Sequence, residues 1–275
     1  MKIENYHFLK DYTAPDMVIS SHENWELLKN QKTSGFRLTE MPALDALLGG
    51  LQEGEVIVVS GLTKHGKTTL CQTLTKQMIE DENYALWFSF EVPAKQFLSF
   101  MVENEKVPLF YMPQQLKSKN LEWLEERIKE AIVKYNIKAV FIDHLHFLLD
   151  MKRHNISLEI GSIMRFLKEI AIKYSLVIFL IAHTQKLNSE TEPDASSIRD
   201  SSFVGQESDA VLVVLRMEEE NKAKLKVAFT RRTGAFQKKI NLIKKGKWFE
   251  EEKDDNKTRS IGDRETYLPY KNGSD

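Results

Sequence analysis

The residues in this sequence that most clearly could do chemistry are the eight at positions 61–68. They read Gly-Leu-Thr-Lys-His-Gly-Lys-Thr and match the pattern G-x-x-x-x-G-K-[ST], between an apolar run and a stretch with helical periodicity. In that setting the backbone N–H groups of the loop and the positive end of the next helix favour a phosphate group. The pattern therefore predicts a site for ATP and Mg²⁺, formed by Gly61, Leu62, Thr63, Lys64, His65, Gly66, Lys67, Thr68 and Thr69.

Within this loop three residues have distinct predicted tasks. Gly66 lets the backbone approach the phosphates, Lys67 reaches the β- and γ-phosphates, and the hydroxyl of Thr68 is a ligand for Mg²⁺. Because the pattern lies directly after a predicted strand and directly before a predicted helix, we expect the loop to be a phosphate-binding loop.

Two carboxylates follow other predicted strands. Asp143 ends the apolar run at 139–142, and Glu91 follows the run at 85–90. At the carboxyl edge of a parallel sheet Asp143 would face the phosphate-binding loop and hold Mg²⁺, directly or through water. Glu91 could orient and deprotonate the water that attacks the γ-phosphate, or it could be a structural cap for the next helix.

The elements that must position these residues alternate along the chain. Apolar runs predict strands at 56–60, 85–90, 139–142, 177–182 and 211–215, and helical periodicity predicts helices at 67–81, 94–105, 121–135 and 163–174. Residues 224–230 and 238–244 resemble a closing antiparallel pair. Strands that alternate with helices predict an α/β fold with a mainly parallel central sheet, flanked by helices.

The chain divides into three predicted parts. Residues 1–34 form an arm that contains a short helix from residue 21, capped by Ser20 or Ser21, and that is either loosely attached or docked on a neighbouring subunit. Residues 35–250 form the ATPase domain. Residues 251–275 lack periodicity and are predicted to be a solvated, disordered tail.

Composition excludes several classes. Lys plus Arg (39) nearly cancels Asp plus Glu (40), so any basic surface must be local, and the five lysines from 238 to 247 favour a solvated face over a nucleic-acid contact. A single cysteine, Cys71, excludes an internal disulfide and a cysteine metal cluster. No apolar run reaches the roughly 18 residues of a membrane span, and no signal peptide is evident. We expect a cytoplasmic protein with no membrane partner.

Three of these segments carry a family resemblance when taken in order. Residues 34–55, Phe88-Ser-Phe-Glu at 88–91 and Ile-Asp-His-Leu-His-Phe at 142–147 resemble motifs of the DnaB-type hexameric replicative helicases and their phage and mitochondrial relatives, within the RecA-like superfamily. The resemblance spans about residues 34 to 250. It implies a RecA-like P-loop ATPase and a helicase motor that acts on single-stranded DNA as a ring, with active sites shared between subunits.

The resemblance also assigns roles to single residues. Glu91 matches the catalytic base, and His183 matches the residue that senses the γ-phosphate, with Gln185 as a weaker candidate. Arg232, within Thr-Arg-Arg-Thr-Gly at 230–234, matches an arginine finger that acts on ATP bound to the adjacent subunit. Thr230 replaces a lysine found there in some relatives, so that second cation is missing or comes from Arg231. The alternative is two surface arginines in a turn.

The segment at 197–210 resembles the part of the family that faces the central pore. Arg199, Ser201 and Ser202 are therefore candidates for contacts with DNA phosphates, which position DNA without reading its sequence. The segment departs from the family at Ser202, often glycine, and at Gly205, often acidic. The alternative is an internal loop that only orders the next strand.

Two other functions stay open at this point. One is a RecA/RadA-like recombinase or annealing ATPase that forms filaments on DNA, and the other is a KaiC-like regulatory ATPase that DNA does not stimulate. Only about 34 residues precede the predicted core, so we expect a primase or loader protein to supply what a longer replicative helicase carries, or the ring to be held by the motor domains and the arm.

Overall fold

The computed structural model describes residues 10–14, 16–30, 35–38, 40–117, 120–149, 155–184, 194, 197–198 and 202–252. The chain forms two compact units, Met1–Ser34 and Gly35–Asp275. In the first unit, helix α1 (Ser21–Leu28) begins with a capping box. The Ser20 hydroxyl accepts a hydrogen bond from the Glu23 N–H, and the Glu23 carboxylate accepts one from the Ser20 N–H. None of the α1 side chains is buried.

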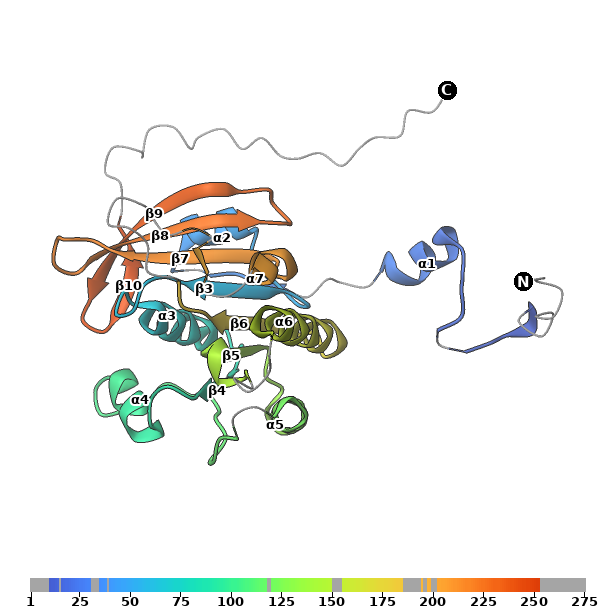
Figure 1. The fold of residues 1–275 in the computed structure, drawn as a ribbon, viewed down its shortest axis with the longest axis horizontal. Coiled ribbons are helices and arrows are strands. Elements are labelled where there is room, and N and C mark those ends of the chain that lie inside the picture. Colours follow the sequence, from blue (N-terminus) through green and yellow to red (C-terminus); the bar gives the residue numbers. More distant parts are fainter. Residues whose placement is uncertain are drawn as a thin grey trace, which may run out of the picture. The chain divides into compact units, whose positions relative to one another are not determined.

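An eight-stranded sheet forms the centre of the second unit (Figure 1). Across the sheet its strands are β10 (Trp248–Glu251), β9 (Phe236–Lys245), β8 (Lys222–Thr230), β7 (Ala210–Arg216), β3 (Val56–Ser60), β6 (Val177–Ile181), β5 (Ala139–Asp143) and β4 (Ala85–Ser89). The five strands from β7 to β4 are parallel, whereas β8, β9 and β10 are antiparallel. The predicted α/β fold with a mainly parallel sheet is confirmed.

Helices cover both faces of this sheet, which explains why the central strands are apolar on both faces up to their carboxyl ends, where Ser60, Ser89 and Asp143 lie. In β3, Ile57 and Val59 pack with α2 (Pro42–Leu48), α3 (Lys67–Glu80) and α4 (Ala94–Met101). Val56 and Val58 pack on the other face with α5 (Leu121–Tyr135), α6 (Ile156–Lys173) and α7 (Ser202–Glu207). The amide side chain of Asn120 caps α5, as the sequence predicted.

Some predicted boundaries differ from the structure. Helix α4 ends at Met101 instead of near Glu105, because Glu103 and Lys106 exchange backbone hydrogen bonds in a turn. The predicted closing antiparallel pair is confirmed as β8 and β9, and it belongs to a larger group, since β8 also pairs with β7 and β9 also pairs with β10. Helices α2 and α7, strand β10 and the two-residue strands β1 (Gly35–Phe36) and β2 (Leu51–Gln52) were not predicted; β1 and β2 pair with each other. No helix within the described residues is long and apolar enough to cross a bilayer.

Candidate nucleotide-binding site

The loop at 61–66 joins β3 to α3, and its two glycines are sterically required. Gly61 has φ +143°, and a Cβ atom there would lie 2.5 Å from the carbonyl oxygen of Val214. Gly66 has φ +98°, and a Cβ atom there would lie 3.0 Å from the ring of Phe249. Since L-residues rarely adopt either conformation, a larger residue at these positions would displace the loop from α3 or from the neighbouring strand.

Lys67 is the first residue of α3 and its side chain bends back over the loop. Its ammonium donates hydrogen bonds to the carbonyl oxygens of Gly61 (3.1 Å) and Leu62 (3.0 Å), and the residue is only 5% exposed. Burial lowers the pKa of Lys67, while the carboxylates of Asp143 and Glu91 raise it. The positive charge is therefore held at the mouth of the loop, where a phosphate would lie.

Thr68 and Asp143 meet directly beneath this loop. The Thr68 hydroxyl donates a 2.8 Å hydrogen bond to Oδ2 of Asp143, whose side chain is almost completely buried. Burial raises the pKa of Asp143 to about 6, against the lowering effect of the Thr68 hydrogen bond. Within the described residues Oδ1 of Asp143 has no hydrogen-bond partner. A buried carboxylate oxygen beside a hydroxyl suits a hard divalent cation such as Mg²⁺.

The raised pKa makes Asp143 a source of instability in the nucleotide-free protein. The folded pKa (about 6) exceeds the ordinary value (3.8), so ionisation of Asp143 disfavours folding as the pH rises from about 4 to 6. A difference of about two pH units, at about 1.4 kcal/mol each, corresponds to roughly 3 kcal/mol above pH 6. Asp143→Asn is therefore expected to raise the free energy of unfolding by up to this amount at pH 8, and by about half as much at pH 5.

Urea unfolding of the nucleotide-free protein at the two pH values measures this effect. Asp81→Asn, at the exposed C-terminal end of α3, is the matched control and should change little. A gain for Asp143→Asn that is equal at both pH values would contradict a burial penalty on the charged carboxylate.

Glu91, His144 and His183 come together at the same edge of the sheet. Strands β4, β5 and β6 are parallel neighbours in which Ser89, Asp143 and Ile181 lie in one row. Each of the three residues follows one of these strands by one or two positions. Nε2 of His144 and Nε2 of His183 both lie 3.9 Å from Oε2 of Glu91. Burial lowers the pKa of His144, and Glu91 raises it.

The alternative role for Glu91, as a cap of α4, is wrong. The N-cap residue of α4 is Pro93, and no side chain makes a capping hydrogen bond there. Glu91 instead points its carboxylate toward the two histidines, within the same electrostatic environment as Lys67 and Asp143. It is thus available for chemistry at the loop.

His65, a loop residue, ties the loop to the neighbouring strand. Its Nδ1 accepts a 3.2 Å hydrogen bond from the backbone N–H of Arg216, at the end of β7. Burial and the nearby Lys67 charge lower the pKa of His65, which keeps Nδ1 able to accept that bond.

Arg232 lies near the amino ends of the parallel strands, whereas the phosphate-binding loop of the same chain lies at their carboxyl ends. Strand β8 runs antiparallel to β7, so its last residue, Thr230, pairs with Ala210 at the start of β7. The Arg232 guanidinium donates to Glu55 Oε1 (2.8 Å) and to the carbonyl oxygens of Gly49 (2.7 Å) and Gly50 (2.6 Å). Glu55 immediately precedes β3, whereas the phosphate-binding loop follows it.

The neighbours of Arg232 are also held by their own chain. Arg231 donates through Nε to the carbonyl oxygen of Ser208 (2.8 Å) and through a terminal nitrogen to that of Gln206. Thr230 is buried and its hydroxyl is hydrogen-bonded to that of Thr233. Of the two arginines, Arg231 holds the end of α7 through hydrogen bonds, whereas Arg232 holds the turn before β3.

The predicted DNA-contacting segment is only partly described. Arg199 and Ser201 lie outside the described residues, as does Gln185, and of Ser202 only its place at the start of α7 is known. Ile198 and Val204 are buried, and Phe203 lies against Gly161 of α6. The described part of this segment therefore packs into the core beside α6, while the DNA contacts stay a prediction.

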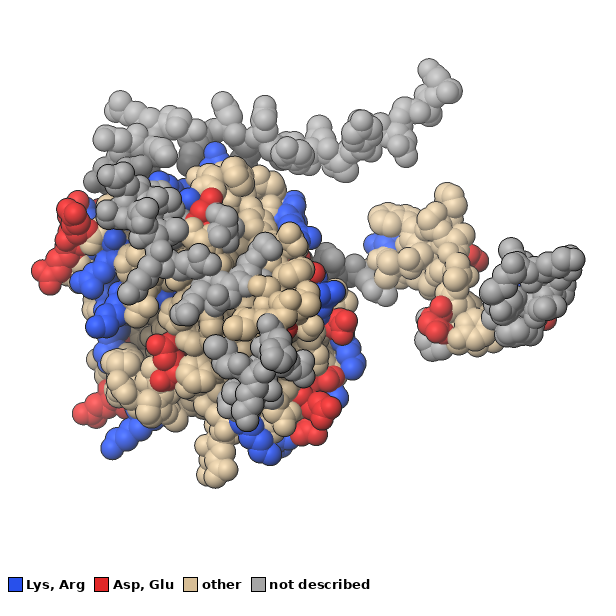
Figure 2. Space-filling model, in the orientation of Figure 1, with Lys and Arg blue, Asp and Glu red and all other residues tan. Residues whose placement is uncertain are grey.

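The five lysines near the end of the chain are exposed (Lys238, Lys239, Lys244, Lys245 and Lys247). Figure 2 shows Lys and Arg side chains on the side of the molecule formed by the antiparallel strands, beside acidic ones. Lys245 pairs with Glu250, and Lys247 donates to the carbonyl oxygens of Ser99 and Val102. These contacts agree with a solvated face.

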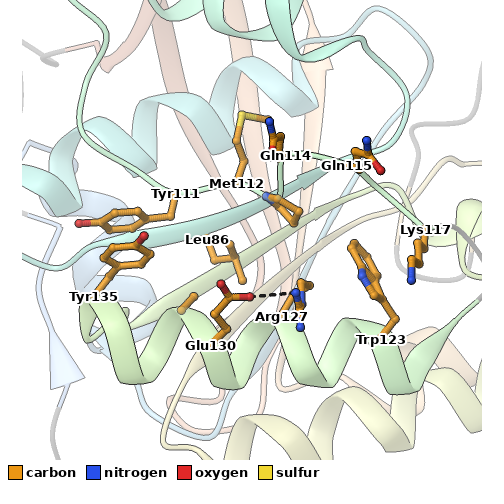
Figure 3. Close-up of a pocket in the computed structure, with 12 residues that line it drawn as sticks. Leu86, Tyr111, Met112, Gln114, Gln115, Lys117, Trp123, Arg127, Glu130 and Tyr135 are labelled. Carbon is orange, nitrogen blue, oxygen red and sulfur yellow. Dashed lines mark ion pairs between the residues drawn. The ribbon is translucent and has the colours of Figure 1, made fainter.

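A separate cavity lies beside β4, the outermost strand on one side of the sheet. It has a volume of about 450 Å³ and lies between α5 and the segment at 111–117, with the stacked rings of Tyr111 and Tyr135 at one end and Trp123 at the other (Figure 3). None of its lining residues belongs to the loop or to the cluster around Glu91.

Sequence reasoning missed one member of this edge, His144. It was part of the motif at 142–147 but had no assigned role. The signal was present: β4, β5 and β6 are each followed within two residues by a titratable side chain, and adjacent parallel strands bring such side chains together.

Comparison with known proteins agrees with this geometry. The family description "DnaB-like helicase C terminal domain" matches residues 37–109 and 105–250. The replicative DNA helicase DnaB of Mycoplasma pneumoniae is 25% identical over 217 residues, which cover 65% of this chain and 46% of that protein. The chain spans about half the length of the curated relatives it matches.

Solved structures show the same fold. A structure described as a DnaB-like replicative helicase and its interactions with primase superposes with a TM-score of 0.69 at 15% identity, covering 85% of this chain and 68% of that one. A second structure, described as an ATPase domain, gives a TM-score of 0.66 at 15% identity, with 81% of this chain and 93% of that one covered. The predicted RecA-like fold is confirmed, and this chain belongs to the DnaB-like helicase C-terminal domain family.

Proposed function

We propose that this chain is the motor of a DnaB-type replicative helicase, which hydrolyses ATP and moves along single-stranded DNA as a hexameric ring in the cytoplasm. One observation carries the proposal: Lys67, Thr68, Asp143 and Glu91 lie together at one sheet edge, in a chain whose residues 37–250 match the family. The curated relatives are named as replicative DNA helicases.

Each residue at this edge has a task that its position supports. Lys67 exchanges its bonds to Gly61 and Leu62 for the β- and γ-phosphates of ATP. Thr68 and Asp143 would hold Mg²⁺, which would supply positive charge to the phosphates. Glu91 accepts a proton from the attacking water, because it is the carboxylate that faces the site without being buried beneath the loop. His183, beside Glu91, senses the γ-phosphate.

The active site is shared between subunits in this proposal. Because Arg232 and the loop of one chain are at opposite edges of the sheet, Arg232 acts on ATP bound to the adjacent subunit. Arg199, Ser201 and Ser202 contact the phosphates of single-stranded DNA in the pore. The proposed partner is a primase or a loader protein, and primase is the one named in the description of a similar structure.

The alternatives have less support. A filament-forming recombinase and a regulatory switch ATPase share the phosphate-binding loop, but the family that matches most of this chain is that of the helicases.

Steady-state ATP hydrolysis, measured with and without single-stranded DNA at several protein concentrations, tests the proposal. Because the site is shared, specific activity should rise cooperatively with protein concentration, and DNA in the pore should raise it several-fold further. Hydrolysis that ignores DNA would support the regulatory class, and DNA-dependent filaments under the electron microscope would support the recombinase.

A further inference from the structure

The cluster of Glu91, His144 and His183 has the composition of a transition-metal site. One atom from each side chain, a carboxylate oxygen or an imidazole nitrogen, lies within 4.8 Å of the other two. Two imidazoles and one carboxylate are a donor set that holds Zn²⁺ in many proteins and leaves a fourth position open. We propose that these three residues bind Zn²⁺, or a similar transition-metal ion, at a site separate from that of Mg²⁺.

The distances are close to those that a tetrahedral ion requires. Bonds of about 2.0 to 2.2 Å from Zn²⁺ to nitrogen and oxygen place neighbouring ligand atoms about 3.4 Å apart. Both Nε2 atoms lie 3.9 Å from Oε2 of Glu91, about 0.5 Å beyond this spacing, and the three donor atoms all lie within 4.8 Å of one another. The Glu91 side chain is 44% exposed, which leaves it room to move closer to the histidines.

The two histidines are held more firmly than Glu91. Their side chains are 13% and 21% exposed, and both follow closely on neighbouring buried strands, β5 and β6. The rings of His144 and His183 pack edge to face at 4.4 Å, and the ring of His144 also lies 4.9 Å from that of Phe147. Ligands fixed by packing need little ordering when the ion binds, which favours affinity.

The donor atoms separate this site from the one at the loop. Thr68 and Asp143 offer only oxygen atoms, which suit Mg²⁺. Imidazole nitrogens are poor ligands for Mg²⁺ and good ligands for Zn²⁺. Millimolar Mg²⁺ is therefore expected to leave the second site open.

Occupation of this site would stop the motor, and this step rests on the proposed function. A carboxylate bound to Zn²⁺ is a much weaker base, because the cation opposes the addition of a proton, so Glu91 would no longer deprotonate the attacking water effectively. In this proposal, zinc inhibits ATP hydrolysis by binding to the proposed base, Glu91.

Zinc binding by the nucleotide-free protein in excess Mg²⁺ tests the site without reference to activity. Calorimetry should find one Zn²⁺ per chain, and Co²⁺ in its place should show the visible absorption of a low-coordinate site. His144→Gln should weaken binding by at least about 10-fold, since loss of a direct ligand costs no less than loss of an outer-shell partner. His146→Gln, whose ring lies 5.4 Å from that of His144, is the matched control and should bind as the unchanged protein does. Equal binding by His144→Gln, or no stoichiometric binding at all, would overturn the proposal.

Measurement of ATP hydrolysis tests whether bound zinc inhibits the ATPase, which is a separate question from whether zinc binds. A slight molar excess of Zn²⁺ should inhibit the unchanged protein and His146→Gln, a chelator should restore them, and His144→Gln should keep the rate that it has without zinc. Stoichiometric zinc binding without inhibition would refute the proposed inhibition and argue against Glu91 as the base. It would still support the metal site itself. Lack of ATP hydrolysis under all conditions would refute the proposed function and leave the binding measurement intact.

Discussion

Arg232→Ala is expected to lower ATP turnover by about 10³- to 10⁵-fold, the range that an arginine finger contributes, while ATP affinity changes little. The reason is positional. In the proposed function Arg232 stabilises charge that develops in the transition state of a neighbour's ATP, because it lies at the end of the sheet opposite to its own loop. Single-turnover hydrolysis and nucleotide binding, measured on the same assemblies, check both parts.

Arg231→Ala is the matched control for this prediction. Arg231 donates to the carbonyl oxygens of Gln206 and Ser208, and Arg232 is likewise bonded within its own chain, so only the resemblance to the family motif assigns the finger to Arg232. The Arg231→Ala substitution should reduce the stability of the end of α7 more than it reduces ATP turnover. A loss of turnover as large as that of Arg232→Ala would make Arg231 the finger, or one of two.

Mixed assemblies test whether the site is shared. In a random equal mixture of Arg232→Ala and Glu91→Gln chains, about a quarter of the interfaces combine an intact Arg232 with an intact Glu91. Activity should therefore return in the mixture although each variant alone is inactive. No recovery in well-formed mixed assemblies would mean that both residues act within one chain, which contradicts the proposal.

Glu91→Gln is expected to bind ATP with nearly normal affinity but to hydrolyse it about 10²- to 10⁴-fold more slowly. The amide keeps the size of the side chain but cannot accept a proton from water, and ATP contacts the loop elsewhere. Fluorescent-nucleotide binding beside steady-state turnover measures the two effects. Glu82→Gln, before the other end of β4, is the control. Near-normal turnover by Glu91→Gln would mean that another residue is the catalytic base.

Much of the site could be predicted because it depends on strand order and strand ends. The apolar runs at 56–60 and 139–142 have a length and composition that only a buried strand explains, and parallel neighbours place Asp143 and Glu91 at the edge that carries the loop. His183 follows from the same rule.

The rest depends on contacts between distant parts of the chain. Strand β10 is short and forms because it pairs with β9 and packs Phe249 against Gly66. Helix α4 ends where a turn at 103–106 takes over the hydrogen bonds, a choice that periodicity does not encode. The bonds of Arg232 to Gly49 and Gly50 depend on a turn almost two hundred residues earlier in the sequence.

The placement of the loop and Arg232 on opposite edges of one sheet has a geometric consequence for assembly. Two different patches can meet in a two-fold dimer, in which each loop faces the Arg232 of the other copy and both patches are hidden, or in a head-to-tail contact that leaves one patch exposed on each end copy. Repeated head-to-tail contact gives a closed ring if the rotation per copy closes and a spiral if it does not. A closed ring has as many complete sites as copies. An open spiral always has one fewer, with a bare loop at one end and an unused arginine at the other.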